Sequence, residues 1–100
     1  MKDITMEKFL ELDPKEIQLI DVREPAEFAE AHIEWAKNIP KWQLVARKWE
    51  LDRNKTLYLI CKWWARSSFM AQVMEQRGFD VINILGGNDE YLKLTWKSWN

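Results

Sequence analysis

The strongest constraint on this chain is that short apolar stretches alternate with stretches of helical spacing. Residues 16–22, 56–60 and 80–85 are short, apolar and rich in β-forming side chains, as buried strands are. Each is followed by a segment with helix signals. This alternation predicts an α/β fold in which a parallel sheet carries helices on both faces. In such sheets, ligands bind beyond the carboxyl ends of the strands.

Helix signals occur in five segments. Thr5 can cap the first, in which Phe9 and Leu10 face inward, and Pro14 prevents a longer helix. Pro25 suits the first turn of the second. The predicted helical segments are 6–12, 24–32, 42–51, 67–77 and 89–99.

Glycines and a proline mark the predicted turns between these elements. Gly78 lies where the cap of helix 67–77 belongs, and Gly86-Gly87 predicts a sharp turn after the strand 80–85. Around Ile39 a short extended piece ends at Pro40. The helix before Gly78 is predicted to bury an apolar stripe made of Phe69, Met70, Val73 and Met74.

Composition disfavours several classes of function. The chain has 100 residues, with 15 Lys and Arg against 16 Asp and Glu, so it has no general attraction for nucleic acid or anionic lipid. One cysteine allows no internal disulfide, which fits a reducing compartment. The opening lacks a signal-peptide core, and no apolar run has transmembrane length. We therefore expect a soluble, cytoplasmic, single-domain protein without nucleic-acid or membrane partners.

Cys61 lies where the strand 56–60 ends and a helix is about to begin. A helix N-terminus presents unpaired N–H groups and partial positive charge, and Lys62 and Arg66 add to it, so a thiolate is favoured there. Asp21, at the end of another strand, could supply a carboxylate for Arg66. A lone cysteine is also often only a small buried apolar residue, and this alternative stays open.

Three motifs carry a resemblance to a known family. The segment at Cys61 reads CKWWARS, an earlier one reads LIDVREPAEFAEAHIEWAKNIP, and a later one reads GFDVINILGG. In this order and spacing they resemble the active-site loop, the Asp-Val-Arg signature and the last strand of rhodanese-like sulfurtransferases. The resemblance runs from about residue 17 to residue 96.

The resemblance implies a single rhodanese-like domain over residues 1–100, with about five strands in a mainly parallel sheet. Cys61 would take a sulfane sulfur from an anionic donor such as thiosulfate, become a persulfide, and pass the sulfur to cyanide or a thiol. A protein could also serve as donor or acceptor, and no metal or organic cofactor is implied.

The same resemblance assigns roles to residues around the loop. Cys61 would be catalytic, and the backbone N–H groups that follow it would hold the persulfide. Asp21, Arg23 and Ser67 would support the loop, with Arg23 able to pair with Glu27 four residues on. The substrate-binding residues would be Lys62, Trp63, Trp64, Ala65 and Arg66.

Two other functions compete with sulfur transfer. Phosphatases and arsenate reductases of the superfamily have five residues between Cys and Arg, whereas four separate Cys61 from Arg66 here, which favours sulfur transfer. Trp64 stands where the loop often has Gly, as Ala31 and Glu34-Trp35 replace other small residues of the pattern. A catalytically weak binding module, or an engineered Trp-rich variant, would fit these changes.

Tryptophan is unusually frequent, with seven residues in the chain. Because tryptophan is rarely fully buried, several must lie at the surface, in a pocket or at an interface. Trp63 and Trp64 are expected to line the mouth of the site, although one of them could instead pack on a neighbouring helix. The single histidine, His32, is expected to lie at a structural turn. Structural roles are expected for Trp35, Trp42, Trp49, Trp96 and Trp99.

Overall fold

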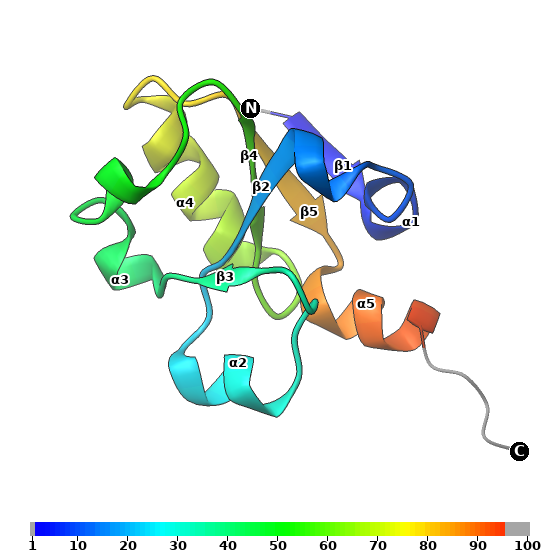
Figure 1. Ribbon diagram of the computed structural model, residues 1–100. Helices are drawn as coiled ribbons and strands as arrows, with labels where there is room; N and C mark the ends of the chain where they lie inside the picture. Colours follow the sequence, from blue (N-terminus) through cyan, green and yellow to red (C-terminus); the bar gives the residue numbers. More distant parts are fainter. Residues whose placement is uncertain (1, 96–100) are drawn as a thin grey trace, which may run out of the picture.

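A computed structural model describes residues 2–95 of the chain (Figure 1). Its centre is one five-stranded sheet in the order β1-β5-β4-β2-β3. All four pairings between neighbouring strands are parallel, which confirms the predicted fold class. The strands are β1 (Lys2–Thr5), β2 (Ile17–Asp21), β3 (Lys37–Asn38), β4 (Thr56–Ile60) and β5 (Val81–Leu85).

Helices cover both faces of the sheet, as Figure 1 shows. On one face α4 packs with α3, and on the other α1 packs with α5. The helix α2 lies beyond the carboxyl end of β2 (Figure 1). The α-helices are α1 (Met6–Phe9), α2 (Pro25–Glu30), α3 (Lys41–Leu44), α4 (Ala65–Glu75) and α5 (Gly87–Thr95), with short 3-10 turns at Pro14–Glu16 and Lys48–Glu50.

The central strand β4 is buried on both faces because its side chains alternate between two cores. Leu57 and Leu59 point into the core under α4, together with Met70 and Met74. Tyr58 and Ile60 point into the opposite core, under α1 and α5. The alternation brings Cys61, the next residue, to the α4 side.

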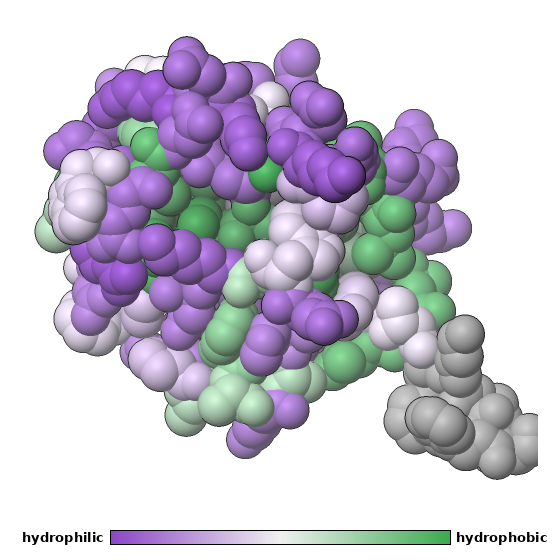
Figure 2. Space-filling model, viewed as in Figure 1, coloured by the Kyte–Doolittle hydropathy of each residue, from purple (hydrophilic) through white to green (hydrophobic). Residues whose placement is uncertain are grey.

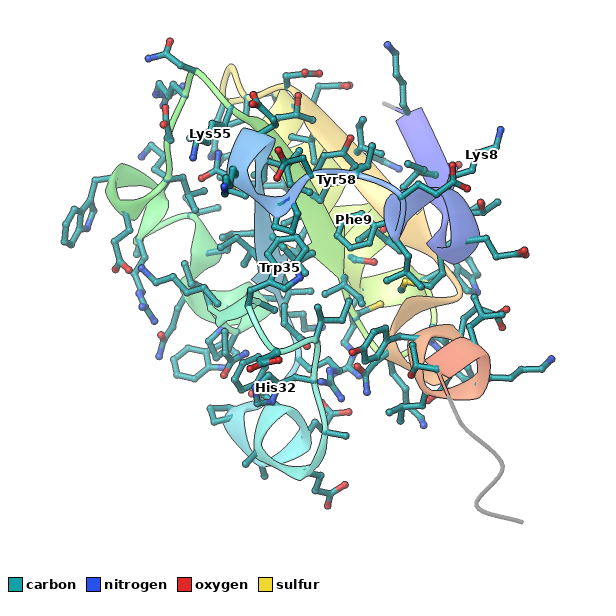
Figure 3. All side chains as sticks on the ribbon, turned by 45° about the vertical axis from the view of Figure 1, so that its right-hand side comes forward. Lys8, Phe9, His32, Trp35, Lys55 and Tyr58 are labelled. Atoms are coloured by element: carbon teal, nitrogen blue, oxygen red, sulfur yellow. The ribbon has the colours of Figure 1, made fainter. Side chains whose placement is uncertain are left out.

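An aromatic cluster packs α1 against the sheet (Figure 3). The ring of Phe9 is stacked on Trp35 at 5.7 Å between centroids and tilted against Tyr58 at 5.3 Å. Phe9 faces inward, as predicted, and the Oγ1 of Thr5 accepts a hydrogen bond from the N–H of Lys8 as the predicted cap. Leu10, predicted to face inward, is exposed.

Three other details differ from the sequence-based expectations, and a fourth expectation is not tested. The strand β1 was not predicted, because it is short and mostly exposed at the edge of the sheet. The helix predicted over 42–51 is only the single turn of α3 and a later 3-10 turn. Phe69 lies outside the buried stripe of α4, at 64% exposure. The end of the last predicted helix, with Trp96 and Trp99, lies outside the described residues.

Within residues 2–95, no helix has the length and apolarity needed to span a membrane. The carboxyl ends of β2, β4 and β5 meet at one edge of the sheet because the strands are parallel. Asp21, Cys61 and the turn at Gly86-Gly87 therefore lie at this edge.

Candidate active site

Cys61 lies between the end of β4 and the start of α4, as the sequence predicted. Its side chain is fully buried. The Sγ atom is 3.2 Å from the Oγ of Ser67 in the first turn of α4. Ser67 is itself fully buried, so the two side chains meet out of contact with water. Ser67 therefore lies next to the sulfur of Cys61.

The loop after Cys61 carries a row of free backbone donors. Within residues 2–95, none of the N–H groups from Lys62 to Arg66 donates a hydrogen bond to a protein acceptor. Unpaired donors are expected before and within the first turn of a helix. Successive donors of this kind, at the positive end of α4, form a place where an anion or a charged sulfur is stabilised.

The N-terminus of α5 holds the first two carbonyl groups of the loop. The N–H of Asn88 donates to the carbonyl of Cys61 at 2.8 Å, and the N–H of Asp89 donates to that of Lys62 at 2.9 Å. Gly87 permits this close approach: a Cβ there would lie 2.4 Å from the carbonyl oxygen of Cys61, and its φ is +56°. The turn predicted at Gly86-Gly87 therefore also shapes the loop.

Arg66 is bound to Glu27 of α2, 39 residues away in the sequence. Its two terminal nitrogens donate to the two carboxylate oxygens at 2.7 and 3.0 Å. This corrects two expectations: Asp21 is not the partner of Arg66, and the carboxylate of Glu27 does not pair with Arg23. Arg23 instead donates to the backbone carbonyl of Glu27. The hydrogen bonds from Arg66 lower the pKa of Glu27 from 4.5 to about 2.

Replacement of Glu27 by glutamine is expected to change the response to acid. Because the folded-state pKa of Glu27 is depressed, its ion pair stabilises the fold above about pH 4.5 and the benefit is lost towards pH 2. The pair is partly exposed, so we expect a loss of about 1 kcal/mol at neutral pH. Urea unfolding from pH 7 to pH 2 should show the parent and Glu27→Gln converging below about pH 4.5. Glu30→Gln, on the same helix, should track the parent throughout.

Asp21 and Arg23 form a buried ion pair, with exposures of 1% and 4%. The Nε and one terminal nitrogen of Arg23 donate to the Asp21 carboxylate at 2.8–3.1 Å. Within residues 2–95 the Asp21 carboxylate has no hydrogen bond to the Cys61 loop. The ion pair is connected to the loop indirectly. Arg23 and Asn88 both donate to the carbonyl of Ala31, and Asn88 also donates to the carbonyl of Cys61.

Asn88 is a residue of the site that the sequence did not reveal. It is 3% exposed, and its backbone and side chain join the loop to Ala31. Its Oδ1 is buried and has no hydrogen-bond partner within the described residues. Asn88 follows two glycines, where a polar residue is ordinary in a turn, so no pattern in the sequence distinguished it.

A family model for the rhodanese-like domain matches residues 6–94. The chain belongs to the rhodanese-like family. Over 88 residues it is 43% identical to YqhL, an uncharacterized protein of Bacillus subtilis (strain 168), a match that covers 87% of this chain and 69% of YqhL. Over 73 residues it is 34% identical to YtwF of the same organism, a putative sulfurtransferase, covering 73% of this chain and 71% of YtwF.

The same fold occurs in a solved structure of a rhodanese-related protein from Thermoplasma volcanium. The TM-score is 0.89 at 26% sequence identity, over 97% of this chain and 96% of that one. The short loop from Cys61 to Arg66 is thus carried on a rhodanese-like fold.

The tryptophans of this rhodanese-like domain do not occupy the left-handed backbone region that favours glycine. Trp64 has a φ of −170°, and within residues 2–95 only glycines have positive φ. Ala31, also at a position often held by Gly, has extended backbone. Trp63 and Trp64 are each 55% exposed. Both side chains therefore stand at the surface of the loop, and neither is buried against a helix.

The structure also shows the contacts of two other residues of the rhodanese-like domain for which the sequence predicted roles. Lys62 pairs with Asp89 at 3.1 Å, and about half of each side chain is exposed. The ring of His32 stacks on that of Phe28, with 3.7 Å between the ring centroids. The Nδ1 of His32 lies 2.6 Å from the carbonyl oxygen of Phe28, near the end of α2 (Figure 3). The local contacts of His32 match the structural turn expected for it.

A cavity of about 160 Å³ lies between α2 and α5, beside the loop, with Arg23, Lys62 and Asn88 among its lining residues. A second cavity, of about 360 Å³, is lined by residues that include Ile17, Trp35 and Leu51, and no residue from 61 to 66 contributes to it. On the face drawn in Figure 2, hydrophilic side chains surround a hollow with apolar side chains at its base. The larger cavity therefore lies apart from the Cys61 loop.

Proposed function

We propose that this rhodanese-like domain transfers sulfane sulfur from an anionic donor such as thiosulfate to a thiol or cyanide through a persulfide on Cys61. The observation that carries the proposal is the row of unpaired N–H groups from Lys62 to Arg66, directly after the buried cysteine. These donors suit a persulfide anion, whose charge would otherwise lack a partner beneath the surface.

The reaction needs only groups of this chain and its two substrates. The Cys61 thiolate attacks the outer sulfur of thiosulfate, a sulfur–sulfur bond forms, and the bond to the sulfonate sulfur breaks, so that its electron pair leaves as sulfite. An acceptor nucleophile then attacks the outer sulfur of the persulfide, and Cys61 departs as the thiolate. No external oxidant or reductant is consumed.

Residues around the loop have distinct proposed roles in this reaction. Lys62, with its partly exposed ammonium group, would attract the anionic donor, and Trp63 and Trp64 would form the wall that it passes. Arg66 is already held by Glu27, so its proposed contribution is to fix the helix end and add positive potential beside the sulfur. Ala65 would contribute its backbone N–H.

Intact mass tests the proposal directly. Incubation of the reduced protein with thiosulfate should add the mass of one sulfur atom, and a thiol should then remove it. Cys61→Ser should gain nothing because it removes the only cysteine of the chain. Loading of Cys61→Ser to the level of the parent, or no loading of a folded parent, would contradict the proposal.

A binding module is the second candidate, favoured by one specific observation. Cys61 is fully buried while the neighbouring Trp63 and Trp64 are half exposed, and exposed aromatic residues are enriched at protein interfaces. A folded protein that stays unloaded by thiosulfate, yet loads from a persulfide-bearing protein, would favour this function.

A further inference from the structure

Asn83 is a buried polar residue in the middle of an otherwise apolar strand. It lies on β5, is 1% exposed, and is in register with Leu59 of β4 and Asp3 of β1. A buried amide weakens a core unless its polar atoms are hydrogen-bonded. The Oδ1 of Asn83 accepts a hydrogen bond from the hydroxyl of Ser67 at 2.5 Å. Asn83 thereby connects the sheet to the residue that touches Cys61.

The Ser67 hydroxyl has one proton and three polar neighbours. They are the Oδ1 of Asn83 at 2.5 Å, the carbonyl of Trp64 at 3.2 Å and the Sγ of Cys61 at 3.2 Å. The closest of them is an amide oxygen, which can only accept. The shortest of the three contacts therefore places the hydroxyl proton on the side of Asn83 when Cys61 is a neutral thiol.

Ionisation of Cys61 changes this arrangement. A thiolate can only accept, and Ser67 is the side-chain donor beside it. When Ser67 turns its proton to the sulfur, the Oδ1 of Asn83 is left buried without that donor, which is unfavourable. Asn83 and the thiolate thus compete for the same proton, and the acidic proton of Cys61 itself leaves to solvent.

We propose that Asn83 is a positioning residue that holds the Ser67 hydroxyl away from Cys61, so that the thiolate forms less readily than it would without Asn83. The role of Asn83 in catalysis rests on the proposed sulfur transfer. The competition between Asn83 and Cys61 for the Ser67 proton does not. Any group that draws the Ser67 proton to the sulfur favours the thiolate, which is the nucleophilic form of cysteine.

The charged groups near Cys61 and the N–H groups of its loop are the same in the parent and in an Asn83 variant. Within residues 2–95, the three basic side chains around the cysteine are each paired with a carboxylate. The pairs are Arg66 of α4 with Glu27 of α2, Lys62 of the loop with Asp89 of α5, and Arg23 with Asp21 of β2. Substitution of Asn83 alters none of these charges.

The test is a pH titration of the thiolate absorbance in the far ultraviolet, taken as the difference from Cys61→Ser. This signal needs neither sulfur transfer nor access of a reagent to the buried thiol. Asn83→Leu, which removes the acceptor, should lower the midpoint by about one pH unit. Ser67→Ala, which removes the donor, should raise it by a similar amount.

The double variant distinguishes loss of the hydrogen bond between Asn83 and Ser67 from a general loosening of the core. Because Asn83 acts through Ser67, the Asn83→Leu, Ser67→Ala protein should have the midpoint of Ser67→Ala alone. Ile84→Val, a buried change on the same strand, should leave the midpoint of the parent. Circular dichroism checks folding, and Asn83→Ala, which only removes atoms, replaces Asn83→Leu should leucine prevent folding.

Outcomes distinguish this proposal from the proposed function. An unchanged or raised midpoint in the folded Asn83 variants, or an equal shift with and without Ser67, overturns the role of Asn83. If the parent never loads sulfur while the midpoints of the variants shift as described, the sulfur transfer is overturned and the role of Asn83 stands.

Discussion

Arg23→Leu is expected to lower the free energy of unfolding by about 3–5 kcal/mol, because it leaves the buried Asp21 carboxylate without its partner. The guanidinium also donates to the carbonyl of Ala31, so the loss extends to the support of the loop. Single domains have only about 5–15 kcal/mol in total. Urea unfolding at neutral pH should therefore show a much lower midpoint than the parent.

Matched variants show whether the uncompensated charge is the cause. Lys37→Leu breaks the exposed pair with Glu50 and should leave the unfolding midpoint close to that of the parent. Adding Asp21→Asn to Arg23→Leu removes the buried charge and should recover part of the loss. If Arg23→Leu is as stable as Lys37→Leu, the buried pair does not hold this edge of the sheet.

Gly87→Ala is expected to lower the free energy of unfolding by about 2–5 kcal/mol, from backbone strain at positive φ together with the clash. A Cβ at this position would lie 2.4 Å from the carbonyl oxygen of Cys61 and 2.7 Å from that of Lys62, both backbone atoms. The N-terminus of α5 must then move away, and the loop loses the hydrogen bonds to its first two carbonyls. Sulfur loading should fall together with stability.

Gly78→Ala is the control for backbone strain alone. Gly78 has a φ of +91°, but a Cβ there would meet only the flexible end of Arg53, at 3.2 Å. It should therefore cost only about 1–2 kcal/mol and leave sulfur loading unchanged. Equal unfolding midpoints for the two variants would mean that the contact between α5 and the loop contributes nothing.

Much of the fold could be predicted because the buried elements have strong local patterns. β4 is an apolar run buried on both faces, and the stretch 56–60 was predicted with the bounds that the structure has. β1, with the sequence KDIT, lies at an edge and buries too little for such a signal. The apolar spacing in 42–51 was misleading because Trp42 and Trp49 are exposed and do not bind a helix to the core.

The site was predictable where its residues are neighbours in sequence and not where they meet only in space. Cys61, Ser67 and Arg66 share one strand–loop–helix junction, so their proximity follows from the order of elements. The pairing of Arg66 with Glu27 joins two elements that no spacing rule connects, and the i,i+4 rule suggested Arg23 instead. Asn83 and Asn88 are single amides whose meaning depends on their buried surroundings.

The close contact between α5 and the loop, set against the exposed side chains of Trp63 and Trp64, limits where this protein can diversify. Positions 63 and 64 are half exposed and neither has a positive φ, so other side chains can replace the tryptophans without displacing the core. Gly87 admits no such exchange. New specificities can therefore arise by single substitutions at positions 63 and 64. The side of the loop that contacts Gly87 must keep its shape.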